Sequence, residues 1–218
     1  MKITLISTST YPSDQGIRTI SSCLKKAGHQ VQLIFLTASE DYSKFYSENV
    51  LEQLKNMCKD SGLIGFSSMA STSKRAEQAI AYLKSLNIPI AWGGIHATLS
   101  PDECMQYVDI VCRGEGEEAA VELADAIEKN QDITKIKNLW VRKNEIIHKN
   151  DVRPLIQNID ELPFVDYDLD TQYVLEKEKI IKFQERHLNG QIFFLTGRGC
   201  PYGCTYCSNR FLNLMYAG

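Results

Sequence analysis

The chain has 218 residues, 44% apolar and 23% charged, a composition typical of a globular protein with one full domain and part of another. Its net charge of −3 gives no electrostatic reason to expect a nucleic acid or an anionic membrane as partner. No apolar stretch is long enough to cross a bilayer, and the first eight residues are typical of a strand rather than a signal peptide, so we expect a cytoplasmic protein.

The first 130 residues alternate between short apolar runs and amphipathic segments. The apolar runs predict five strands, at 3–6, 31–36, 63–66, 88–92 and 108–112. Apolar residues at helical spacing predict helices within 17–27, 50–58, 76–86 and 120–127, the first of them ending at Gly28. This alternation predicts an α/β domain over residues 1–130, a doubly wound five-stranded parallel sheet covered by helices on both faces.

Four loops of this domain are rich in small and polar residues. They follow the first, third, fourth and fifth strands, at 7–16, 67–73, 93–98 and 113–117. In a doubly wound sheet, ligands bind beyond the carboxyl ends of the strands. We therefore expect all four loops to lie on the ligand-binding edge.

The pattern changes after residue 130. Residues 139–141 and 145–148 predict a small hairpin, with 142–144 as its turn. A proline-punctuated connector follows, and 167–189 is polar and partly helical in pattern. We therefore expect 131–189 to be a linker with a small hairpin and little core of its own.

The seven cysteines form two groups. Four are scattered singly through periodic segments and are expected to be small buried apolar residues: Cys23, Cys58, Cys104 and Cys112. The other three, Cys200, Cys204 and Cys207, are clustered, which in a reducing compartment indicates metal or redox chemistry.

Cys200, Cys204 and Cys207 have the spacing Cys-x3-Cys-x2-Cys in a loop with two glycines and a proline. Cysteine thiolates hold iron–sulfur clusters, and three of them leave the fourth iron of a four-iron cluster open. The spacing differs from a bacterial ferredoxin run and suits structural zinc poorly, because zinc takes four ligands and the nearest candidate is His187. Zinc ligation and ordinary thiols stay open as alternatives.

This motif, with the aromatic Tyr206 before its last cysteine, resembles the radical S-adenosylmethionine (SAM) signature. The resemblance implies that the three cysteines bind a [4Fe–4S] cluster and that SAM chelates the fourth iron. Reductive cleavage of SAM then gives a 5′-deoxyadenosyl radical. It also implies that Tyr206 lies near the adenosine and that 192–199 is the first strand of a barrel. Tyr206 as a core aromatic residue is the alternative.

A second resemblance involves the predicted ligand-binding edge. Ser67-x-Met69 with Ser71, and later Gly93-Gly94, resemble elements of cobalamin-binding domains, although Met69 replaces the usual leucine. The histidine motif that supplies a cobalt ligand is absent from 7–16, so the resemblance implies cobalamin without a lower histidine ligand.

The segments 93–98, 113–117 and 160–163 also resemble this group of proteins, which makes His96 and Glu115 candidate cofactor contacts. Each candidate has a structural alternative. Gly93 and Gly94 suit a tight turn, and His96 suits a hydrogen-bonded loop histidine. Glu115 suits a solvated acidic loop or a helix N-terminus, and the two serines suit helix capping.

These resemblances imply a function for a longer parent protein. Residues 190–218 would be the first strand and cluster loop of a truncated radical SAM barrel, because a complete barrel needs about 200 residues. We expect a cobalamin-dependent radical SAM enzyme, a methyltransferase or a related cyclising enzyme, that takes a small-molecule substrate and electrons from a flavodoxin or ferredoxin. The alternatives are a non-catalytic corrinoid-binding module and a radical SAM enzyme whose first domain no longer binds cobalamin.

Overall fold

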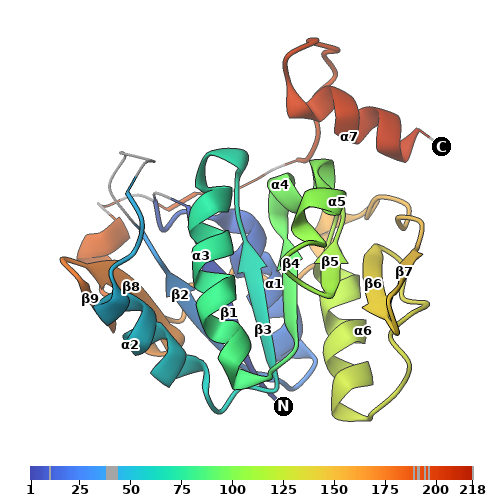
Figure 1. Ribbon diagram of the computed structural model, residues 1–218. Coiled ribbons are helices and arrows are strands. Elements are labelled where there is room, and N and C mark those ends of the chain that lie inside the picture. Colours follow the sequence, from blue (N-terminus) through green and yellow to red (C-terminus); the bar gives the residue numbers. More distant parts are fainter. Residues whose placement is uncertain are drawn as a thin grey trace.

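The structure, a computed structural model, describes residues 1–9, 11–37, 44–188, 190, 192–193, 195 and 197–217. Within these residues one nine-stranded sheet has the order β7-β6-β5-β4-β3-β1-β2-β8-β9 (Figure 1). Its strands are β1 (Lys2–Ser7), β2 (Gln30–Phe35), β3 (Leu63–Ser67), β4 (Ile90–Gly93), β5 (Ile110–Cys112), β6 (Leu139–Lys143), β7 (Ile146–Lys149), β8 (Gln172–Glu176) and β9 (Lys179–Lys182).

Helices connect the strands on both faces of the sheet. They are α1 (Gln15–Lys26), α2 (Glu48–Cys58), α3 (Ser73–Leu83), α4 (Gly94–Leu99), α5 (Pro101–Cys104), α6 (Glu117–Glu128) and α7 (Ser208–Tyr216). Short 3₁₀ turns lie at Ala70–Thr72, Lys84–Leu86, Ile159–Glu161, Leu169–Thr171 and Glu185–Leu188.

The expected α/β doubly wound fold is confirmed. β1 pairs in parallel with both β2 and β3, and β4 and β5 continue the parallel set. Helices α1 and α6 pack together on one face, and α2 and α3 pack together on the other (Figure 1). All carboxyl ends of the parallel strands therefore meet at one edge, as the loop pattern predicted.

Each face of the sheet has its own apolar core. Leu5 of β1 packs with Ile17 and Leu123 on the face covered by α1 and α6, whereas Ile6 packs with Leu54 and Ile80 on the opposite face. Successive strand residues point to opposite faces, so burial on both faces requires consecutive apolar residues. This requirement explains why the strands have apolar residues at adjacent positions, such as Leu5-Ile6 in β1 and Leu33-Ile34-Phe35 in β2.

Local capping fixes the ends of α1. The Asp14 carboxylate accepts a hydrogen bond from the Ile17 N–H at 3.3 Å and so caps the helix N-terminus. The helix ends just before Gly28, as expected, where φ is 93° and only glycine is unstrained. The resulting position of α1 places its first turn at the ligand-binding edge.

Residues 131–189 require a correction. The predicted hairpin is confirmed as β6 and β7, but β6 also pairs with β5, and β8 pairs with β2 and carries β9. The segment thus extends the sheet at both edges, and the expected five-stranded count and linker with little core are wrong. Edge strands leave backbone N–H and C=O groups unpaired, and these later strands pair with them.

The C-terminal segment lies over the carboxyl edge of the sheet (Figure 1). The expected barrel strand at 192–199 does not form in the described part of that range, and Phe194 and Thr196 lie outside the described residues. A barrel strand requires a neighbouring strand for its hydrogen bonds, and within the described residues none lies beside this segment. The cysteine loop then leads into α7.

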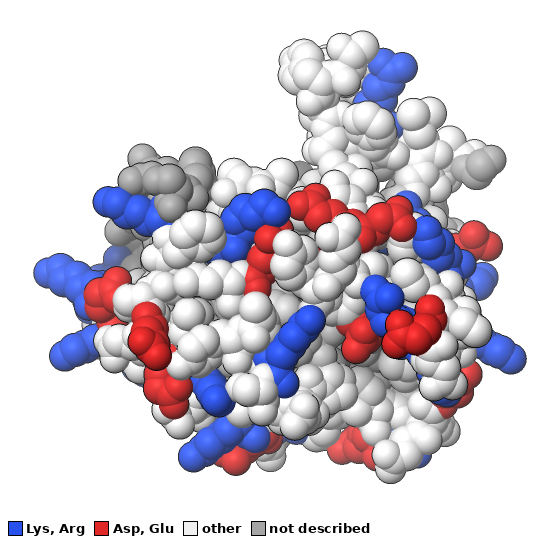
Figure 2. All heavy atoms as spheres, in the orientation of Figure 1, with Lys and Arg blue, Asp and Glu red and all other residues white. Residues whose placement is uncertain are grey.

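Charges of both signs are interspersed on the face shown in Figure 2, whereas the projecting C-terminal part is largely uncharged. No helix among the described residues is both long and apolar enough to span a membrane.

Candidate functional site

A cavity of about 780 Å³ opens at the carboxyl edge of the sheet. Its inner wall lies between the sheet and the helices α1 and α6, and its rim includes Arg198 and Gly199, just before the first clustered cysteine, and part of α7. Four residues singled out from the sequence line it, namely Ser67, Gly93, Gly94 and Glu115. The loops after β3, β4 and β5 therefore converge on one cavity.

Small residues keep the inner wall open. A Cβ atom at Gly65 would lie 2.7 Å from Leu5 Cδ2, and one at Gly116 would lie 2.8 Å from Ile20 Cδ1. Ala120, on α6, also lines the cavity. Larger side chains at these positions would fill the space between the sheet and the helices.

Gly94 holds two loops of the edge against each other. Its φ is 88°, and a Cβ there would lie 2.9 Å from the Ser68 carbonyl oxygen and 3.0 Å from Ser67 Oγ. The conformation and the close approach both require glycine. Gly93 and Gly94 therefore form a tight turn and also line the cavity, so the two predictions for this pair are compatible.

Asp14 is a polar junction at this edge that the sequence did not single out. Its carboxylate accepts hydrogen bonds from Ser7 Oγ at 2.8 Å and from Ser67 Oγ at 3.2 Å, in addition to capping α1. An aspartate three residues before an apolar helical stripe is a capping signal that could have identified it. The junction ties the loop after β1 to the end of β3.

Three other predicted residues lie outside the cavity wall. Ser71 is exposed in a 3₁₀ turn, and Tyr206 is 90% exposed. His96 is buried against Trp92, with ring centroids 5.6 Å apart, and its Nε2 lies 3.9 Å from Glu103. Burial lowers the pKa of His96, which favours the neutral imidazole. The alternative predicted a hydrogen-bonded loop histidine, whereas His96 lies in α4 and its Nε2 has no hydrogen-bond partner among the described residues.

The cysteine loop presents three free thiols. Cys204 is exposed, and Cys200 and Cys207 are half-buried. Gly199, with φ at 85°, introduces the loop, and the Cys207 N–H donates to the Cys204 carbonyl at 3.1 Å. Free thiols on a backbone that can fold around a ligand are the donor set that an iron–sulfur cluster requires.

A different group brings three potential metal ligands within 4.8 Å of one another. Among the described residues this group is His29, Asp125 and Glu128, at the opposite edge of the sheet. The N-terminal amine donates to Glu128 at 2.6 Å, so this group is an ion-pair network. The three clustered thiols do not form such a group among the described residues, and a four-iron cluster does not require it, because each thiolate binds a different iron.

The four scattered cysteines differ in burial. Cys58 and Cys104 are fully buried, as expected, and Cys23 and Cys112 are half-buried. Cys112 lines the cavity, and burial raises its pKa to about 12. A thiol with that pKa stays protonated near neutral pH and is a poor metal ligand.

The acidic loop after β5 is paired rather than solvated. Arg198 donates to Glu115 at 2.8 Å and to Glu117 at 2.5 Å. Burial lowers the pKa of Arg198, but the hydrogen bonds and charges of the two carboxylates outweigh it and raise the pKa overall. The cysteine loop is thereby fixed to the rim of the cavity.

Comparisons with known proteins agree with this geometry. Residues 1–124 match the family model of the B12 binding domain. An uncharacterised methyltransferase from Pyrococcus horikoshii is 31% identical over 157 residues, which cover 69% of this chain and 32% of that protein. An anaerobic magnesium-protoporphyrin IX monomethyl ester cyclase from Synechocystis is 26% identical over 204 residues, covering 89% of this chain and 38% of that protein.

Among solved structures, the cobalamin-dependent S-adenosylmethionine radical enzyme OxsB superposes with a TM-score of 0.64 at 18% identity. The match covers 77% of this chain and 24% of that one, and it shows a shared fold. The chain spans about a third of the length of the two curated relatives described above. Because the family match covers more than half of its residues, the chain belongs to the B12-binding domain family.

Proposed function

We propose that this chain is the cobalamin-binding region and cluster-binding loop of a cobalamin-dependent radical SAM enzyme, a methyltransferase in the first instance. The observation that carries the proposal is the cavity of about 780 Å³ at the sheet edge, whose rim includes the start of the cysteine loop. When bound, cobalamin would supply a methyl carrier, and the cluster would supply the electron that cleaves SAM.

The residues of the chain fit these groups. The apolar wall between sheet and helices suits a flat aromatic group such as the nucleotide tail of a corrin, and Gly65, Ala120 and Gly94 keep space for it. Ser67 supplies a polar atom to the cavity lining, and its hydroxyl donates a hydrogen bond to Asp14. Cys200, Cys204 and Cys207 would hold three irons through thiolate sulfur.

The proposal is tested by anaerobic reconstitution with iron and sulfide and by titration with hydroxocobalamin, followed by visible absorption. We expect a stoichiometric cobalamin complex and a four-iron cluster, with reductive cleavage of SAM by the complete protein. A protein that binds hydroxocobalamin and forms no cluster would contradict the radical enzyme and support the corrinoid-binding module.

The corrinoid-binding module is the second candidate because the cavity is well formed while Cys204 and Tyr206 are exposed. A cluster without hydroxocobalamin binding would instead support a radical enzyme whose first domain has lost cobalamin. The cyclase relative makes ring closure the alternative reaction to methyl transfer. In either reaction, we propose a small-molecule substrate and a cytoplasmic electron donor such as a flavodoxin or ferredoxin.

Filling the cavity is expected to weaken cobalamin binding strongly without unfolding the domain. Ala120→Phe places a ring in the inner wall, so we expect hydroxocobalamin affinity to fall by on the order of 100-fold. Ala81→Phe is the matched control, because Ala81 is exposed on α3 over the opposite face of the sheet. Equal affinities of the two variants in the absorption titration would show that the cavity is not the binding site.

A further inference from the structure

We infer that Arg198 is a positioning residue that fastens the cluster-binding loop to the rim of the cobalamin cavity through Glu115 and Glu117. Arg198 lies two residues before Cys200. The inference rests on the proposed function, because it assigns the cysteine loop to a cluster and the cavity to cobalamin.

The ion pairs of Arg198 are well enclosed. The Glu117 side chain is only 6% exposed and that of Glu115 is 16% exposed. Arg198 uses both terminal nitrogens of its guanidinium, one for each carboxylate. Without Arg198, the buried Glu117 would lose its ion-pair partner and keep only the partial stabilisation of the α6 N-terminus, which is unfavourable. The position of the cysteine loop is thus coupled to the neutralisation of the Glu117 carboxylate by Arg198.

Glu115 joins the loop to two further segments. Its second carboxylate oxygen accepts from the Ile156 N–H at 2.7 Å, and its own N–H donates to the Tyr216 hydroxyl oxygen at 2.8 Å. The acidic loop therefore contacts the connector after β7, the cysteine loop and the end of α7. A substitution at Glu115 would remove the side-chain contacts with Ile156 and Arg198, whereas the contact with Tyr216 is made by the backbone N–H.

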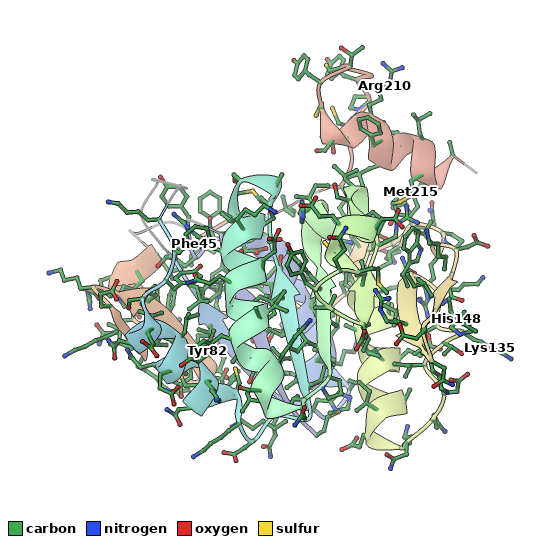
Figure 3. The ribbon with its side chains drawn as sticks, in the orientation of Figure 1. Phe45, Tyr82, Lys135, His148, Arg210 and Met215 are labelled. Atoms are coloured by element: carbon green, nitrogen blue, oxygen red, sulfur yellow. The ribbon has the colours of Figure 1, made fainter. Side chains whose placement is uncertain are left out.

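Helix α7 also contacts the cysteine loop and so completes a ring of contacts, here called the rim contacts, among Glu115, Glu117, Arg198, Asn213 and Tyr216. Asn213 Nδ2 donates to the Cys200 carbonyl at 3.0 Å, and Met215 Sδ lies 3.7 Å from Arg113. Figure 3 shows Met215 on the side of α7 that faces the domain, whereas Arg210 points away from it. A Cβ at Gly114 would overlap the Tyr216 hydroxyl oxygen, and the backbone there has φ at 73°, a conformation that favours glycine.

The residues that make the rim contacts also line the cavity. Those that line the cavity are Glu115, Glu117, Arg198, Gly199, Asn213 and Tyr216. The side chains that hold the loop in place are therefore the ones that a ligand in the cavity would contact. Ligand binding and loop order then share one set of contacts, which couples them reciprocally.

The inference is tested by hydrogen–deuterium exchange of peptides from 197–217 in the protein without cobalamin. Arg198→Gln removes the positive charge and both ion pairs, with Glu115 and Glu117. We therefore expect these peptides to exchange about tenfold faster. Arg198→Lys keeps the charge but cannot donate from two separate nitrogens to the two carboxylates. Exchange of these peptides in this variant should therefore be intermediate. Arg186→Gln is the matched control, because Arg186 pairs with Glu176 at the surface near β8.

A second measurement separates positioning from a merely structural role. Saturating hydroxocobalamin should slow exchange of 197–217 in the wild type and have little effect in Arg198→Gln. Glu115→Gln combined with Arg198→Gln should add less than the sum of the single effects, because both remove the same contact.

Unchanged exchange in Arg198→Gln, or equal protection by hydroxocobalamin in both proteins, would overturn the inference. Wild-type protein that fails to bind hydroxocobalamin would contradict the proposed function alone, because exchange without cobalamin still decides the role of Arg198.

Discussion

Replacing Arg18 by alanine is expected to lower the free energy of unfolding by about 3–5 kcal/mol, the largest effect on stability among these variants. Arg18, on α1, is fully buried. Its guanidinium donates to the Asp166 carbonyl and to Gln172 Oε1, both at 2.7 Å, and to the Pro12 carbonyl at 3.0 and 3.2 Å. Truncation would leave these buried oxygens without a donor.

Aromatic rings enclose the same cation. The guanidinium carbon of Arg18 lies 4.5 Å from the Phe35 ring centroid, 4.6 Å from that of Tyr167 and 5.4 Å from that of Phe183. These rings come from β2 and from the segments flanking β8 and β9, so Arg18 joins α1 to the later strands. Losing it should also loosen the first turn of α1 at the cavity.

Thermal unfolding measures this effect, and a decrease of the midpoint on the order of 10 °C is expected. Arg186→Ala is the control, because Arg186 is exposed and surface ion pairs contribute little. A midpoint of Arg18→Ala close to that of Arg186→Ala would show that the buried contacts do not stabilise the fold. Arg18→Met, which keeps apolar contact with the rings, should lie between Arg18→Ala and the wild type.

Replacing Cys204 by alanine is expected to prevent formation of the four-iron cluster, the largest functional effect. Only three cysteines lie in the loop, and a cluster that uses all three has no spare thiolate there. Iron and sulfide content after anaerobic reconstitution, with visible absorption, measures the loss. Because Cys204 is exposed and contributes little packing, the fold of the domain should be unaffected.

Cys23→Ala is the matched control for this loss. Burial raises the pKa of Cys23 to about 11, so the thiol stays protonated at neutral pH and is not available as a ligand. We expect normal iron content in this variant. Full iron content in Cys204→Ala, or loss of iron in both variants, would contradict the assignment of the cluster to the loop.

The sequence predicted the central fold because its signals are local. Apolar residues at adjacent positions, such as Leu5-Ile6 and Leu63-Ile64, indicate burial on both faces, and the buried residues of β1 and β3 confirm it. The loops after β3, β4 and β5 were assigned correctly to one edge, where Ser67, Gly93 and Glu115 line the cavity. Parallel strands require that common edge.

The sequence did not predict the direction in which individual side chains point. His96 follows the Gly-Gly pair, but α4 starts at Gly94 and places the imidazole against Trp92 rather than in the cavity wall. Arg198 was not singled out, although an arginine beside the cysteine motif and an acidic Gly-Glu-Gly-Glu segment have complementary charge. Complementary charges 81 and 83 residues apart become informative only when the fold brings them together.

The sequence by itself therefore determined the doubly wound core, its ligand-binding edge and the three-cysteine motif, because periodicity and motif spacing are properties of neighbouring residues. The tertiary structure alone decided that 172–182 extends the sheet beside β2 and that Arg198 joins the cysteine loop to the cavity rim. Strand pairing across an edge and ion pairing between distant segments depend on long-range contacts, which local sequence patterns do not encode.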